Sequence, residues 1–261
     1  MNRLRDCIYG QAVGDALGVP YEFCARGTFK CDGMTGFGTH RQPAGTWSDD
    51  TSMTLAICDS YRVKGYIDID DIRNRFLSWF YNDEYTCDYV FDVGNTTASA
   101  LKSKQGNSDE YSNGNGSLMR TLPLAFTNAT NEEIEAVSAI THAHQISTKA
   151  CVTLTRIARM LIDGSSPRIV AETLDFDYTD DVGFIRSGGY VLDTLYAAFW
   201  CLVTTSTYEK CVLKAVNLGD DTDTTATIAG GLAGIAYGID QIPSKWIEQL
   251  RNKETIERCL F

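Results

Sequence analysis

The chain has 261 residues, 44% hydrophobic and 22% charged, which is enough apolar material for a sizeable core. Its 34 acidic and 23 basic residues give a net charge of −11, which argues against non-specific binding to nucleic acids or anionic membranes. Nine scattered cysteines without a C-x-x-C pattern fit reduced thiols rather than a disulfide framework or a zinc site. With no apolar signal segment and no run that approaches a membrane span, we expect a cytoplasmic protein.

Helical patterns follow one another along the chain. The first is a helix over residues 1–23, in which Gly10, Gly14 and Gly18 share one stripe and permit close contact with a second helix. Residues 24–47 predict a long surface loop, and loops of that length in compact domains are usually functional. Ser48 is a good N-cap for a helix over residues 49–63. Further helices are expected over residues 68–83, 97–104, from Pro123 onward, 131–144 with Asn131 as its cap, 147–163, 189–203, 208–217, 222–238 and 244–251.

Strand patterns are scarce in this sequence. Few segments alternate between apolar and polar residues, and no Asn-Gly turn joins two apolar runs. No internal repeat, low-complexity tract or convincing linker divides the chain. We therefore predict one all-α domain over residues 1–261.

Two aspartate clusters, far apart in the sequence, each open a predicted helix. Residues 48–51 read Ser-Asp-Asp-Thr, which by itself is typical of a helix cap. Residues 220–224 read Asp-Asp-Thr-Asp-Thr, more like charge than capping needs, and the glycine-rich helix that follows indicates tight burial. No Lys or Arg is adjacent to offset this charge. Because oxygen ligands of such density suit Mg²⁺ or Mn²⁺ rather than Zn²⁺, clusters that meet in space would form a two-metal enzyme.

Two other all-α families that bind metals through carboxylates fit less well. Prenyl-chain and terpene synthases need Asp-Asp-x-x-Asp, but Met53 stands at the third position, and Ile228 replaces the Glu of their second motif. Ferritin-like di-iron sites need Glu-x-x-His pairs, and His40, His142 and His144 lack that partner.

Seven segments, in order along the chain, resemble the motifs of the ADP-ribosylglycohydrolase family, which contains dinitrogenase reductase-activating glycohydrolase. One such segment alone would be a weak signal, but their shared order from residue 10 to about residue 238 is specific. The segments are GQAVGDALGVPYEF (10–23), TWSDDT (46–51), DVGNTT (92–97), GNGSLMR (114–120), THAH (141–144), GGYV (188–191) and NLGDDTDT (217–224).

The resemblance implies an all-α fold with a dinuclear Mg²⁺ or Mn²⁺ centre. Many relatives have Thr where Ser48 stands, and the hydroxyl is kept. Asp220 stands where many relatives have Gly, so it lies either beside the ligands or in solvent. The implied metal ligands are Ser48, Asp49, Asp50, Asp221, Asp223 and Thr224.

The resemblance also implies catalytic and substrate-binding residues. Glu22 resembles the family's gating acid and Asp92 a catalytic carboxylate, and the sequence does not say which is the general base. The loop at residues 114–117 could offer backbone N–H groups to a pyrophosphate, while Arg120 is expected to be a buried structural cation. His142 or His144 could bind phosphate or ribose, and Tyr190 could stack on adenine. The implied substrate-binding residues are Asn115, Gly116, Ser117, His142, His144 and Tyr190.

The implied activity is metal-dependent cleavage of the glycosidic bond between ADP-ribose and a modified protein side chain. Two alternatives stay open: an ADP-ribose binder that has lost catalysis, and a hydrolase of another ADP-ribosyl conjugate. The expected partner is an ADP-ribosylated protein or small molecule, with nucleic acid only as an ADP-ribosylated substrate. The loops at residues 24–47 and 105–117 are expected to select the linkage, which the sequence does not reveal.

Overall fold

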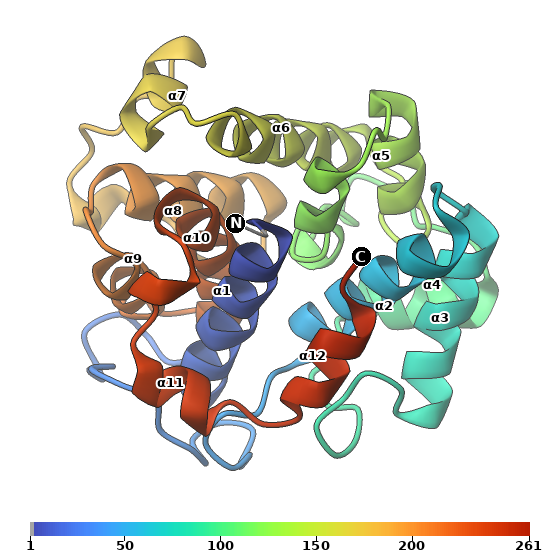
Figure 1. Cartoon of the computed structure of the whole chain (residues 1–261), viewed down its shortest axis with the longest axis horizontal. Helices are drawn as coiled ribbons and strands as arrows, with labels where there is room; N and C mark the ends of the chain where they lie inside the picture. The colour runs from blue at the N-terminus through green and yellow to red at the C-terminus, as the bar shows by residue number, and fades with distance from the viewer. Residues whose placement is uncertain (1–2) are drawn as a thin grey trace.

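The computed structural model describes residues 3–261, and that range contains α-helices and short 3-10 helices but no β-strand. The all-α prediction is therefore confirmed. Residues 1 and 2 of the first predicted helix lie outside the described range. The α-helices (Figure 1) are α1 (Arg3–Gly18), α2 (Asp49–Lys64), α3 (Ile69–Asn82), α4 (Asn95–Ser103), α5 (Asn131–Ala139), α6 (Gln145–Ile162), α7 (Pro167–Thr173), α8 (Val191–Val203), α9 (Tyr208–Val216), α10 (Thr222–Tyr237), α11 (Ser244–Gln249) and α12 (Lys253–Cys259).

Helix α1 packs directly against α10 at the centre of the molecule. A Cβ on Gly10 would lie 2.3 Å from the carbonyl oxygen of Gly230. A Cβ on Gly14 would lie 2.1 Å from the carbonyl oxygen of Ala226. No side chain fits at either distance, so the two backbones touch as the glycine stripe predicted.

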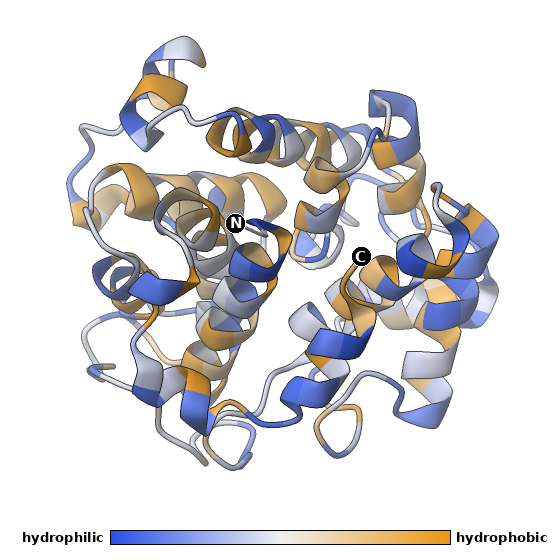
Figure 2. Ribbon diagram, viewed as in Figure 1, coloured by the Kyte–Doolittle hydropathy of each residue, from blue (hydrophilic) through white to orange (hydrophobic). Residues whose placement is uncertain are grey.

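The remaining helices surround this pair. Figure 1 shows α8, α9 and α10 on one side of α1 and α2, α3 and α4 on the other, while α6 lies along the top of the view. Figure 2 shows hydrophobic residues gathered on the α8–α10 side and hydrophilic residues along α12. Every residue of α10 from Thr222 to Ile235 is buried, so this helix forms the middle of the core.

The cysteines are all free thiols, and Cys151, Cys201 and Cys211 lie in the core as predicted. Within residues 3–261, no helix is both long and apolar enough to cross a lipid bilayer.

Helix α5 differs from its prediction at both ends. Its N-cap is Thr130, whose hydroxyl accepts from the N–H of Glu133 at 3.2 Å in a capping box, so Asn131 as the cap was wrong. The helix ends at Ala139 rather than at residue 144. His142 therefore lies beyond the end of the helix, where its backbone forms an isolated β-bridge with Asn107.

Three short elements also differ from the sequence analysis. The segment that contains Pro123 forms only the 3-10 helix Leu122–Phe126. Helices α7 and α12 were not predicted. Each has seven residues, too short for a helical hydrophobic period to stand out, and both depend on packing against longer helices.

Candidate metal centre and active site

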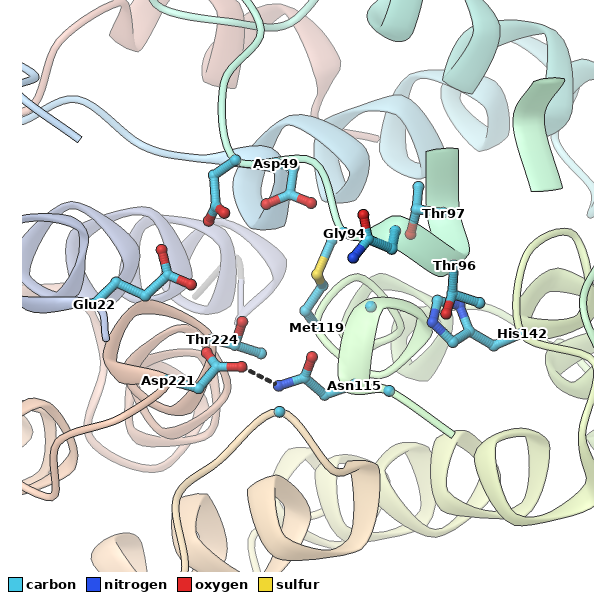
Figure 3. A pocket seen from close by; sticks show the side chains of 15 residues that line it. Glu22, Asp49, Gly94, Thr96, Thr97, Asn115, Met119, His142, Asp221 and Thr224 are labelled. Carbon is cyan, nitrogen blue, oxygen red and sulfur yellow. Dashed lines mark hydrogen bonds between the residues drawn. The ribbon is translucent and has the colours of Figure 1, made fainter. Parts of the chain in front are cut away.

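The two aspartate clusters lie together in the fold, at the N-termini of α2 and α10. The hydroxyl of Thr224, in the first turn of α10, donates to Asp50 Oδ2 in α2 at 3.3 Å. Asp49 and Asp221 line the same cavity of about 220 Å³ (Figure 3). Close packing brings the clusters here, because a Cβ on Gly18 would lie 2.3 Å from the Cα of Asp223.

Asp15, in the last turn of α1, accepts hydrogen bonds from the segment that carries the first aspartate cluster. One of its oxygens accepts from the N–H of Ser48 at 2.9 Å, and the other accepts from the N–H and hydroxyl of Thr51 at 3.0 and 2.6 Å. Burial raises the pKa of Asp15 to about 6. Sequence analysis missed this role, although Asp15 lies within the first of the family motifs, residues 10–23.

The carboxylates of the centre repel one another and lack positive partners. Burial raises the pKa of Asp49, Asp50, Asp221 and Asp223, and other acidic groups of the cluster add to each shift. None of the ion pairs in the described part of the chain involves these four aspartates.

Several oxygens of this cluster are arranged as cation ligands. One oxygen each of Asp50, Asp221 and Asp223 is buried without a hydrogen-bond partner. Glu22, Asp221 and Asp223 offer oxygens that all lie within 4.8 Å of one another. Buried, unpartnered carboxylate oxygens at this spacing fit a hard divalent cation, which would supply the missing positive charge.

Two further acids border the cavity. Glu22 follows the 3-10 helix Val19–Tyr21 and is only 5% exposed, and burial together with Asp92 and Asp221 raises its pKa to about 10. Asp92 lies in the cavity wall with a left-handed backbone φ of 52°. His40 hydrogen-bonds the Glu22 carboxyl and lies 3.9 Å from Asp92 Oδ2. Sequence analysis considered His40 only as an iron ligand and missed this contact.

The opposite wall comes from the 3-10 helix Asn115–Ser117 and the start of α4. The Asn115 amide donates to Asp221 Oδ2 at 2.8 Å (Figure 3). It also donates to Thr194 Oγ1 at 3.0 Å. Gly116 lines the cavity, but Ser117 points away from it and accepts from Ser138 Oγ at 2.9 Å. The Gly94–Thr97 stretch also lines the cavity, although no role had been predicted for it beyond its family motif.

His142 lines the cavity beside Thr96, across from Glu22 and Asp49 (Figure 3). Burial and the Arg120 charge lower the pKa of His142 to about 3, so the ring is neutral. Arg120 donates to Thr141 Oγ1 at 2.8 Å, and Thr141 Oγ1 lies 2.8 Å from His142 Nδ1. Arg120 can only donate to Thr141 Oγ1, and Nδ1 is the one acceptor that the described residues offer the hydrogen of this buried hydroxyl. The hydroxyl therefore donates to Nδ1, which assigns the proton of the ring to Nε2.

Arg120 is completely buried, as predicted for a structural cation. It donates to the carbonyl oxygen of Gly116 at 2.7 Å and lies over the Phe76 ring at 4.6 Å. Its guanidinium thus supports the loop that carries Asn115 rather than reaching into the cavity.

Three other candidate residues lie outside the cavity. His144 caps α6 by accepting from the N–H of Ile146 at 3.2 Å. Tyr190 is 41% exposed at the start of α8, beside the cavity-lining Gly189. Asp220 is exposed, and its φ of 60° is a backbone conformation that favours glycine.

Comparisons with known proteins identify the family of this chain. The model of the ADP-ribosylglycohydrolase family matches residues 1–260. The ADP-ribosylarginine hydrolase Tri1 of Serratia proteamaculans is 33% identical over 282 residues, which cover 98% of this chain and 77% of that protein. The ADP-ribosyl-[dinitrogen reductase] glycohydrolase of Rhodospirillum rubrum is 34% identical over 276 residues, covering 97% and 91%. A solved structure described as an ADP-ribosylglycohydrolase-related protein complex superposes with a TM-score of 0.85 at 30% identity, covering 99% of this chain and 95% of that one. The chain belongs to the ADP-ribosylglycohydrolase family.

Proposed function

We propose that this protein is a metal-dependent hydrolase that releases ADP-ribose from modified protein side chains, with arginine as the preferred acceptor. The observation that carries the proposal is the set of buried carboxylate oxygens without partners, beside a cavity bordered by Glu22 and Asp92. The similarity to Tri1, an ADP-ribosylarginine hydrolase, supports arginine as the acceptor.

The metal centre in this proposal holds two Mg²⁺ or Mn²⁺ ions. Bound ions would lower the pKa of a water molecule and polarise the hydroxyls of the distal ribose. The observed contact between Thr224 and Asp50 supports a ligand set that spans α2 and α10. The proposed ligands are Ser48, Asp49, Asp50, Asp221, Asp223 and Thr224.

The chain's own side chains then supply the proton transfer and the substrate contacts. Hydrolysis forms a bond between a water oxygen and ribose C1″ while the bond from C1″ to the guanidine nitrogen breaks. Glu22 or Asp92 accepts a proton of that water and returns it to the departing guanidine nitrogen, so that one water molecule supplies both the new hydroxyl of ribose and the proton of the leaving group. His142 donates through Nε2–H to the diphosphate, and backbone N–H groups near Asn115 and Gly116 add further donors. Ser117, His144 and Tyr190 stay predictions as substrate-binding residues, with Tyr190 proposed to stack on the adenine.

Turnover of defined substrates tests the proposal. Metal-stripped protein is titrated with Mg²⁺ and with Mn²⁺ against peptides that carry arginine-linked or serine-linked ADP-ribose, and released ADP-ribose is measured. We expect metal-dependent release and preference for the arginine linkage. Full turnover without metal would contradict the proposal. Tight binding of ADP-ribose without turnover of any conjugate would support the non-catalytic alternative.

We further infer a single domain over residues 1–261 and a cytoplasmic location. One continuous core cluster supports the first inference, and nine free thiols support the second. The net charge of −11 disfavours nucleic acid as a partner except where it carries ADP-ribose.

A further inference from the structure

A tight turn over residues 37–42 ends the long loop before α2. The backbone N–H of Phe37 donates to the carbonyl oxygen of Gln42 and closes the turn. The backbone is left-handed at Phe37, Gly38 and Arg41, with φ values of 72°, 54° and 56°. Non-glycine residues adopt this conformation at a cost, so tertiary contacts must hold the turn in place.

Those contacts tie the turn to the segment that carries Glu22. The N–H of Thr39 donates to the carbonyl oxygen of Pro20 at 3.0 Å, and the Thr39 hydroxyl donates to the backbone oxygen of Glu22 at 2.7 Å. A Cβ on Gly38 would lie 2.0 Å from the Pro20 oxygen, so only glycine permits this approach. The turn and the Glu22 segment therefore form one unit.

His40 lies within this turn with its ring directed at the acids. Its Nε2 hydrogen-bonds the Glu22 carboxyl and lies 3.9 Å from Asp92 Oδ2. The rings of Phe23 and Phe91 lie 6.0 and 5.4 Å from the imidazole by centroid. The side chain of His40 is only 14% exposed, so packing restricts its orientation.

Glu22 needs such a partner because its other neighbours are acids. Asp92 and Asp221 disfavour an ionised carboxylate at this position, and a glutamate side chain has several rotamers from which to choose. An N–H donor held by a rigid turn both offsets the repulsion and selects one rotamer.

We propose that His40 is a positioning residue, whose Nε2–H hydrogen bond holds the Glu22 carboxylate at the cavity edge where the glycosidic bond is cleaved. This inference rests on the proposed hydrolase function. The same three side chains, Glu22, His40 and Asp92, also offer atoms within 4.8 Å of one another that could ligate a cation. Metal affinity therefore separates a positioning role from a ligand role.

Paired substitutions test the proposal. His40→Phe keeps a flat ring and removes the donor, whereas His40→Gln keeps an N–H donor. We expect His40→Phe to lower kcat on an arginine-linked ADP-ribosyl peptide by ~10- to 100-fold with KM changed less than about 2-fold. His40→Gln is expected to recover most of that loss. Mn²⁺ affinity and the Tm are expected to match the wild type in both variants.

The matched control is Arg41→Lys, which changes an exposed side chain of the same turn and is expected to keep wild-type kcat. Wild-type kcat in His40→Phe would overturn the proposal, and so would a parallel loss of Mn²⁺ affinity. A wild-type protein that hydrolyses no conjugate defeats the proposed function instead. In that event the imidazole ¹⁵N signals of His40 still test the contact, since we expect them to shift in Glu22→Gln, and unchanged signals would refute it.

Discussion

Individual carboxylate oxygens determine what the centre can bind. One oxygen each of Asp50, Asp221 and Asp223 is buried with no hydrogen-bond partner, while the other oxygen of Asp221 accepts from Asn115. A buried charge without a partner costs several kcal/mol, so burial and mutual repulsion favour protonated carboxyls in the metal-free cluster. The buried acids of this cluster therefore lower the stability of the metal-free protein, and a bound cation would offset that cost.

Removing one of these charges is expected to have opposite effects on stability and on function. Asp223→Asn should raise the Tm of the metal-free protein by about 3 °C, because repulsion within the cluster falls. It should also abolish the Tm increase on adding Mn²⁺ and lower turnover at least ~100-fold. Thermal scans with and without Mn²⁺ check both effects, with Asp240→Asn at an exposed site as the control. A metal-free Tm well below that of the wild type would contradict this account.

The chain from Arg120 through Thr141 to His142 makes a second prediction for single residues. Thr141→Val removes the hydroxyl that donates to Nδ1, so the ring is expected to lose its fixed Nε2–H form and bind ADP-ribose ~10-fold more weakly. Thr141→Ser keeps the hydroxyl and should behave as the wild type. Imidazole ¹⁵N spectra report the tautomer, and calorimetry reports the affinity. Identical spectra for the two variants would rule out the assigned proton.

At the level of the helices, the close contact between α1 and α10 determines where the residues of the candidate site lie. Gly18 in α1 meets Asp223 at the start of α10, and Asp15 in α1 caps the start of α2. The same helix therefore sets the positions of both aspartate clusters. A change in the spacing of α1 and α10 would move the proposed metal ligands even though none of these residues was altered.

Gly14→Ala tests this dependence. The added methyl would lie 2.1 Å from the carbonyl oxygen of Ala226, so the helices must separate, at a cost of about 3 kcal/mol in the free energy of unfolding. Mn²⁺ affinity should fall as well, because the clusters shift apart. The control is Gly183→Ala, which has nothing within 4 Å and should change stability by less than about 0.5 kcal/mol. Urea unfolding and Mn²⁺ titration give the two readouts, and equal stability of the variants would count against the close contact.

For the molecule as a whole, the buried acids couple folding to pH. Asp15 has its pKa raised to about 6 and Glu22 to about 10, against values near 4 in the unfolded chain. A carboxyl with a raised pKa stabilises the fold fully below the unfolded pKa and loses that contribution as pH rises through the folded pKa. Metal binding opposes this loss, because the cation takes the place of the protons.

Stability is accordingly expected to depend on pH and metal together. The Tm of metal-free protein should fall by about 5 °C or more between pH 5 and pH 9, and the Tm increase on adding Mg²⁺ or Mn²⁺ should grow over the same range. Thermal scans at several pH values, with chelator and with each metal, measure both trends. A metal-induced increase that is largest at pH 5 would reverse the sign required by the raised pKa values.

Long periodic segments and spaced motifs were readable from the sequence. Ser48 and the helical spacing of the apolar residues after it predicted the ends of α2 to within one residue. The glycines of α1 predicted a close helix contact, which the structure shows with α10. Short elements were read less reliably: α7 and α12, with seven residues each, were missed, although the six-residue α11 was expected over residues 244–251. Helix α5 starts from a capping box at Thr130 that was assigned one residue late. A helix of two turns carries few hydrophobic positions, so its pattern is often too weak to recognise without its neighbours.

The sequence by itself determined the fold class, the family and the identity of the acidic residues, because these depend on local periodicity and on motifs in order. Only the tertiary structure decided which atoms meet. It directed Ser117 away from the cavity, used His144 as a helix cap, left Asp220 in solvent and brought His40 onto Glu22. Such contacts join residues that are distant along the chain, and they follow from how helices and turns pack rather than from the pattern of any one segment.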